Sequence, residues 1–168
     1  SNNFNCHHII VENWDELESE KGVIFISIPT LLDSSLAPEG KHIIHAFTPS
    51  SIKEWEGLSR KEYLQKKEEY FSFFVEKISK LLPNLDQNID HKEIGTPKTH
   101  KKFLGRYEGS YGPIPSQKLL GLLPMPFNTT KIKNLYCVGD SCFPGQGLNA
   151  VAFSGYACAH KIGSKLNI

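Results

Sequence analysis

The chain has 168 residues, of which 39% are hydrophobic and 22% charged, and its net charge is +1. This length can bury a sizeable core, and the composition excludes wholesale disorder. A nearly neutral charge gives no electrostatic indication of a nucleic-acid partner. There is no run of apolar residues long enough to span a bilayer and no secretory leader pattern, so we expect a protein that is not secreted.

Cysteines and histidines do not form a metal-binding pattern. No two of the four cysteines stand in a C-x-x-C pair, so we expect no metal site and mostly buried, reduced thiols. Histidines at 7, 8 and 100 are expected to be structural. The four cysteines are Cys6, Cys137, Cys142 and Cys158.

The first elements in chain order are two strands and a long helix. The apolar run at 22–28 and the run at 41–47 predict an antiparallel pair of strands. Ser59 and Glu62 then have capping-box spacing, which predicts a helix over 59–82. Aromatic and aliphatic residues recur on one side of this helix at steps of three and four. This stripe packs against the strands or, alternatively, lines a ligand site.

The middle of the chain is less regular. Residues 89–95 predict a third strand, and Thr96-Pro97 places a helix start directly after it. An irregular crossover follows over 105–133, rich in proline and glycine, and long loops of this kind are often functional. A basic cluster precedes it, and it is either solvated surface or a contact for anionic lipid. Its members are Lys98, Lys101, Lys102 and Arg106.

The last part of the chain predicts a strand at 134–138, a turn, and a helix of small residues over about 147–163. Unpaired N–H groups at a helix start favour an anion or an electron-rich ring edge. Gly145 and Gly147 have no Cβ, so a ligand can approach the backbone there. Asp140 offers a carboxylate for sugar or polyol hydroxyls. A nucleotide cofactor meets all these requirements, although such units also occur as plain packing devices.

Gly139-Asp140-Ser141 also matches the start of a GDS-type hydrolase block. Such hydrolases need a later aspartate and histidine to complete a triad. No aspartate follows Asp140 in this sequence, which argues against that reaction.

The segment VGDSCFPGQG at 138–147, followed by AVAFSG at 150–155, resembles the terminal FAD-contacting motif of the carotenoid cis–trans isomerases. Further segments resemble that family in order and spacing, so the resemblance covers almost the whole chain. They are CHH at 6–8, SIPT at 27–30, LDSSLAPEG at 32–40, WEGLS at 55–59, GTPKTH at 95–100, YGP at 111–113 and MPFNTT at 125–130.

The resemblance implies an α/β fold that is a C-terminal fragment of a two-domain flavoprotein similar to phytoene desaturases. Residues 1–133 would be an α+β portion of the substrate domain, namely its later half. Residues 134–168 would be the last strand and helix of a Rossmann-like FAD domain. The G-x-G-x-x-G that opens such a domain is absent from these residues. We therefore expect the fragment alone to be inactive.

By the same resemblance, Gly139, Asp140, Gly145, Gln146 and Gly147 would contact FAD in its reduced form. The reaction would convert poly-cis lycopene to all-trans lycopene without net oxidation, in a membrane-associated protein of a plastid or a cyanobacterial cell. Asn149 departs from the family pattern, which has an apolar residue there. No catalytic residue and no oligomeric state follow from the sequence.

Two other functions remain open. One is a true flavin oxidoreductase, a carotenoid desaturase or retinol saturase, because such enzymes share the outline of the terminal motif. The other is a binding module without catalysis.

Overall fold

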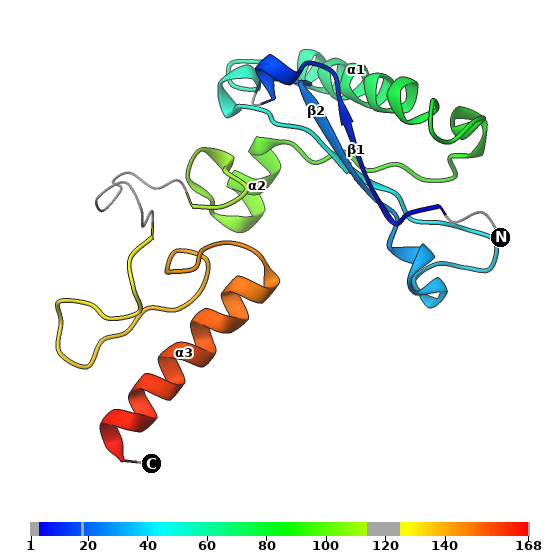
Figure 1. Ribbon diagram of the computed structural model, residues 1–168. Coiled ribbons are helices and arrows are strands. Elements are labelled where there is room, and N and C mark those ends of the chain that lie inside the picture. The colour runs from blue at the N-terminus through cyan, green and yellow to red at the C-terminus, as the bar shows by residue number, and fades with distance from the viewer. Residues whose placement is uncertain (1–3, 18, 114–124, 168) are drawn as a thin grey trace. The chain divides into compact units, whose positions relative to one another are not determined.

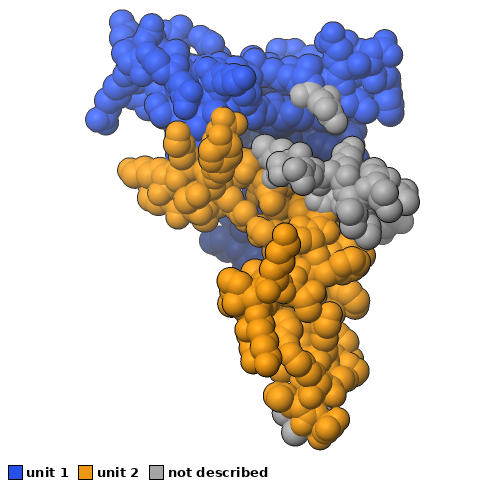
Figure 2. All heavy atoms as spheres, turned by 90° about the vertical axis from the view of Figure 1, so that its left-hand side faces the viewer, with its two compact units in different colours: residues 1–99 blue, residues 100–168 orange. Residues whose placement is uncertain are grey.

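The computed structural model describes residues 4–17, 19–113 and 125–167. Contacts within the chain group into two compact units, residues 1–99 and residues 100–168, which are coloured separately in Figure 2. The described residues form an α+β structure with one three-stranded antiparallel sheet and three α-helices. None of the described helices is both long and apolar enough to cross a bilayer.

The sheet lies in the first unit, in the order β1-β2-β3 (Figure 1). Its strands are β1 His7–Val11, β2 Val23–Ser27 and β3 His45–Phe47. The antiparallel pairing of β2 with β3 confirms the sequence prediction. The sequence did not predict β1, because two histidines open it and only three apolar residues follow.

Helix α1, Arg60–Ile78, runs along one face of this sheet (Figure 1). Its predicted capping box is confirmed, since Ser59 and Glu62 each bond the backbone N–H of the other. The helix ends at Ile78, earlier than predicted, and the Ile78 carbonyl accepts the Leu81 and Leu82 N–H groups in the turn that follows. The aromatic stripe of α1 packs against the strands, which confirms the packing interpretation. The contacts join Phe73 and Phe74 to a buried cluster of Ile24, Ile26, Ile28 and Ile78.

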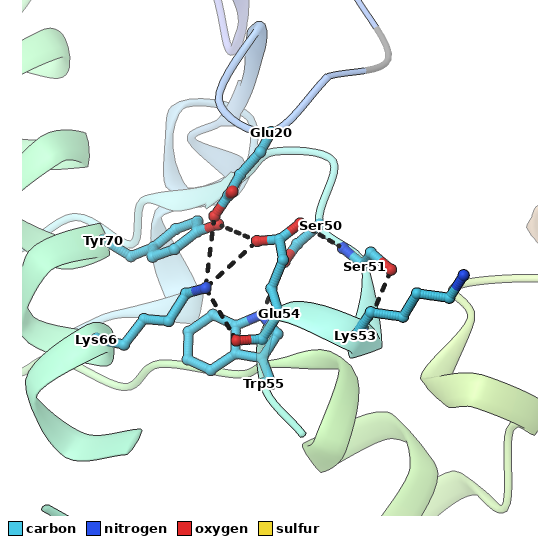
Figure 3. A network of polar contacts seen from close by, with 8 residues as sticks. All are labelled: Glu20, Ser50, Ser51, Lys53, Glu54, Trp55, Lys66 and Tyr70. Atoms are coloured by element: carbon cyan, nitrogen blue, oxygen red, sulfur yellow. Dashed lines mark hydrogen bonds and ion pairs between the residues drawn. The ribbon is translucent and has the colours of Figure 1, made fainter. Parts of the chain in front are cut away.

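A polar network joins α1 to the short turn that precedes it (Figure 3). Lys66 Nζ donates to the Glu54 carbonyl at 3.0 Å, and the Tyr70 hydroxyl donates to Glu54 Oε2 at 3.2 Å. The same ammonium lies 5.1 Å from the Trp55 ring centre. Burial and a hydrogen bond to Glu54 raise the pKa of Glu20. The network holds Trp55, which is only 2% exposed, against the helix.

The predicted strand at 89–95 is wrong, because the structure is irregular there. This segment has charged residues in its middle and no apolar face to bury. Its side chains form ion pairs instead, Asp90 with Lys41 at 2.5 Å and Lys92 with Glu68 at 2.5 Å. The short helix expected after Thr96 is present as α2, Pro97–Leu104.

The second unit contains α3, Leu148–Leu166, which confirms the predicted small-residue helix. The predicted strand at 134–138 is wrong for the described structure, which forms only a single bridge there, between Tyr136 and Thr129. An extended segment becomes a strand only beside further strands, and no other described segment pairs with it. The predicted domain boundary at 133/134 concerns a longer protein and stays a prediction.

Replacing Ser59 with alanine should lower the free energy of unfolding by about 1 kcal/mol, because α1 loses its N-cap acceptor. Urea denaturation of the whole chain, followed by circular dichroism, measures the change. Ser72→Ala is the matched control, because Ser72 is a solvent-exposed residue in the middle of the same helix. Equal midpoints for the two variants would contradict the capping role.

Candidate functional site

The turn between residues 139 and 147 has a backbone that only glycine adopts easily. Gly139, Gly145 and Gly147 have φ angles of +111°, +118° and +105°. L side chains are strained in this region, so the glycines are required by the path of the chain. The turn therefore forms a bend that leads directly into α3.

The start of α3 is open to a ligand. Gly147 is its N-cap and provides no side-chain cap for the free N–H groups. A Cβ added at Gly147 would meet no atom within 4 Å, whereas one at Gly145 would lie 3.8 Å from Met125 Cγ. The positive end of the helix dipole and the space over Gly147 thus coincide, as expected for a site that accepts an electron-rich group.

Asp140 is held by two neighbours. Arg106 donates to its Oδ2 in an ion pair, and Ser141 Oγ donates to Oδ1 at 3.2 Å. The Arg106 hydrogen bond is the main reason why the pKa of Asp140 lies below its ordinary value. The carboxylate is therefore ionised and oriented, and its remaining lone pairs can still accept hydrogen bonds.

Arg106 was not identified as part of this site from the sequence. It was assigned to the basic cluster at 98–106, and only the fold brings it to Asp140. A cavity of about 800 Å³ lies beside it, lined by Leu104, Gly105, Arg106, Tyr107, Glu108, Ser110, Pro113 and Ser141. Within the second unit, Arg106 and Ser141, the two residues that donate to Asp140, therefore border a space large enough for part of a ligand.

A buried serine on α3 fixes the start of the turn. The Ser154 hydroxyl is fully buried and accepts the Gly139 N–H at 3.3 Å and Asn128 Nδ2 at 3.0 Å. Asn128 also donates to the Cys137 carbonyl at 2.9 Å and accepts the Cys137 N–H at 2.9 Å. Asn128 and Ser154 together connect three segments of the unit, and no pattern in the sequence identified either of them as part of the site.

Gln146 differs from the other predicted site residues. A Cβ added at Gly112 would overlap the Gln146 side-chain amide, so this side chain packs on the backbone of the 111–113 segment. The structure thus places the Gln146 amide against the protein.

Members of the basic cluster have different neighbours. Lys98 lies 5.2 Å from the Tyr63 ring centre, Lys102 lies 5.0 Å from that of Phe103, and Arg106 pairs with Asp140. The cysteines are all free, as expected, but only two are fully buried. Cys142 and Cys158 are buried, Cys6 is half-buried and Cys137 is exposed.

Comparison with known proteins gives strong matches along nearly the whole chain. The chain is 56% identical over 165 residues to the chloroplastic prolycopene isomerase of Arabidopsis thaliana, which is 97% of this chain and 28% of the relative. It is 59% identical, with the same coverage, to the chloroplastic prolycopene isomerase 1 of an Oncidium hybrid cultivar. No family model matches.

A more distant relative is named as a dehydrogenase. The 4,4'-diapolycopen-4-al dehydrogenase of Metabacillus indicus is 31% identical over 156 residues, 89% of this chain and 29% of that protein. This chain is therefore homologous to a segment of the prolycopene isomerases, and it spans 28% of the length of the plant relatives.

Ser154→Ala should weaken the second unit by about 1 kcal/mol, because it removes the acceptor of the Gly139 N–H. Hydrogen exchange followed by mass spectrometry should show faster exchange in peptides that cover 134–142 and α3. Ser164→Ala, at an exposed position of the same helix, should leave exchange unchanged. Protection in Ser154→Ala equal to that of the parent chain would show that the serine does not hold the turn.

Proposed function

We propose that this chain, homologous to a segment of the prolycopene isomerases, is the C-terminal part of a flavin-dependent carotenoid cis–trans isomerase acting on poly-cis lycopene. The observation that carries the proposal is identity of 56–59% over 97% of the chain. Identity at this level extends through both compact units, so it is not limited to a cofactor motif.

The turn and helix start fit one edge of FAD. The α3 N–H groups and the open space at Gly147 would receive the ring edge, and Asp140 would accept hydrogen bonds from ribityl or ribose hydroxyls. Arg106 would keep that carboxylate ionised and oriented. Reduced FAD, when bound, would donate electron density to the polyene and so transiently lower the order of one double bond. The flavin would then take this electron density back.

We infer that residues 134–168 complete a Rossmann-like FAD domain, and that 1–133 contribute to the substrate domain. Support comes from the sequence at 134–138, whose apolar run suits a strand that has neighbours on both sides. In the presence of such neighbours, the extended segment at Tyr136 would join their sheet and present Gly139 and Asp140 at its end.

Plastid location and peripheral membrane contact belong to the same proposal. The plant relatives are named as chloroplastic. A carotenoid resides in a bilayer, and α2 combines Lys101 and Lys102 with Phe103 and Leu104, which are 72% and 63% exposed. Such a pairing of basic and apolar side chains suits an anionic membrane surface.

An oxidoreductase is the second candidate, since the Metabacillus relative is named as a dehydrogenase. The higher identity to the prolycopene isomerases favours the redox-neutral reaction. A binding module without catalysis is less favoured, because it would not explain identity through the turn and the substrate-domain segments together.

A chimera tests the activity. This chain would replace the homologous segment of the Arabidopsis relative, and the product would be expressed in bacteria that accumulate poly-cis lycopene. We expect all-trans lycopene, measured by chromatography, with no additional double bond. A folded, flavin-loaded chimera that leaves poly-cis lycopene unchanged would contradict the isomerase proposal, and a further desaturated product would favour the oxidoreductase.

Within this chimera, Asp140→Ala should weaken FAD affinity at least about tenfold, because a hydrogen bond to a charged group contributes about 1.5–3 kcal/mol. Gly147→Val should weaken it further, since a branched side chain would fill the space at the helix start. Flavin content and thermal stability are measured together, with Asp86→Ala as a control outside the turn. Parental FAD affinity in both variants would overturn the cofactor assignment.

A further inference from the structure

Three free cysteines of the second unit lie around the hydrogen bond between Gly139 and Ser154. Cys137 is two residues before Gly139, and the Cys142 N–H donates to the Gly139 carbonyl at 3.3 Å. Cys158 is four residues after Ser154, so the two share one side of α3, and both are buried there. The turn therefore brings together three thiols that have no part in the proposed flavin site.

The electrostatic environment of Cys142 shows that the other two sulfurs are close to it. Burial is the main reason why the pKa of the Cys142 thiol lies above its ordinary value. The negative charges of Cys137, Cys158 and Asp140 raise this pKa further, in that order. Because the interaction between charges weakens with distance, both sulfurs lie near the Cys142 thiol, and Cys137 acts on it more strongly than Cys158.

Accessibility gives the three thiols different reactivity. Cys137 is exposed, whereas Cys142 and Cys158 are only 2% and 4% exposed. An oxidant in solution therefore meets Cys137 first. Cys142 carries little thiolate because its pKa is raised, so it is a poor first nucleophile and is suited to act second, after Cys137 has been oxidised.

Cys142 is a better partner for Cys137 than Cys158 is. Four residues separate Cys137 from Cys142 along the chain, whereas Cys158 lies in the interior of α3, where backbone hydrogen bonds fix its position. A disulfide needs Cβ atoms about 4 Å apart. The turn between the two cysteines contains Gly139 at a φ of +111°, and a glycine joint adjusts to this requirement more easily than a helix does.

We propose that Cys137 and Cys142 are a redox-active thiol pair, which a disulfide compound such as glutathione disulfide oxidises to a disulfide across the Asp140 turn. The Cys137 thiolate attacks one sulfur of glutathione disulfide, so that a mixed disulfide forms and one glutathione leaves as its thiolate. The Cys142 thiol then loses its proton to solvent and attacks the Cys137 sulfur, which releases the second glutathione. The protein loses two electrons and two protons in total, and glutathione disulfide is reduced to two glutathione molecules. A dithiol reductant reverses both steps.

Gly139 and Asp140 lie inside the ring that this disulfide closes. In the reduced chain, the Gly139 N–H donates to Ser154 and Asp140 pairs with Arg106. Drawing Cys137 toward the turn would shift the backbone that makes both contacts. Oxidation would therefore move the carboxylate assigned to the flavin, an effect that rests on the proposed function, whereas the thiol pair itself does not.

Peptide mapping of the whole chain tests the pairing. The reduced chain is incubated at low concentration in glutathione buffers of increasing oxidising strength, and the remaining thiols are then blocked with N-ethylmaleimide. Cleavage before Asp140 separates Cys137 from Cys142, and cleavage after Phe153 separates Cys142 from Cys158. We expect a disulfide that links the Cys137 peptide to the Cys142 peptide. The intact mass should fall by two hydrogens and return to its original value with dithiothreitol.

Single variants separate the two steps. Cys142→Ser should stop at the mixed disulfide, with one glutathione on Cys137, and Cys137→Ser should form neither product. Cys6→Ser, in the first unit, is the matched control and should form the same disulfide as the parent chain, as should Cys158→Ala. Circular dichroism verifies folding, and Cys142→Ala replaces a serine variant that does not fold. The map of the parent chain decides the pairing without any variant.

Four free thiols in every buffer, or a glutathione on Cys137 that is never displaced, would overturn the proposal. A disulfide between Cys142 and Cys158, or dimers joined through Cys137, would also overturn it. Because the mapping needs neither flavin nor substrate, an inactive chimera would leave the thiol pair standing. An active chimera together with a chain that forms no pair would overturn this inference alone.

Discussion

The buried hydroxyl of Ser154 determines where the turn of the second unit can lie. It accepts the Gly139 N–H and the Asn128 amide at one point inside the unit. The acceptor is buried and both contacts are partly buried, so losing it costs about 1 kcal/mol. Gly139 is thereby fixed to α3, and the next residue, Asp140, is directed to Arg106. The positions of the carboxylate and of the helix start therefore depend on one side chain of the helix.

The sequence predicted those parts of the fold that depend only on residues close together along the chain. The Ser59–Glu62 capping box, the stripe of α1 and the glycine turn before α3 are each encoded within a few residues. The segment at 89–95 was wrongly predicted as a strand, and the segment at 134–138 forms only a single bridge in the described residues, because a strand requires partners, which a short apolar run does not reveal. The Arg106–Asp140 pair joins residues far apart in sequence, so neither residue indicates the other by spacing.

The first unit is organised around a different constraint, the need to bury an aromatic helix beside a small sheet. Ile24 and Ile26 fill one face, and the Lys66–Glu54 contacts secure the turn that carries Trp55. A three-stranded sheet is near the lower limit of independent stability and depends on packing against a helix. The two-residue alternation of β2 therefore turns Ile24 and Ile26 toward the core that α1 covers.

The expected strength of the proposed cofactor contacts limits what the second unit would contribute to binding. A helix start at an exposed site contributes about 0.3–1 kcal/mol, while association costs about 4 kcal/mol or more. The hydrogen bonds of Asp140 do not reliably close this difference. In the proposed flavoprotein, the turn, Asp140 and α3 would therefore be better suited to orienting a flavin than to holding it unaided. Orientation is also what the geometry provides, since Arg106 and Ser154 fix the carboxylate and the helix start before any ligand arrives.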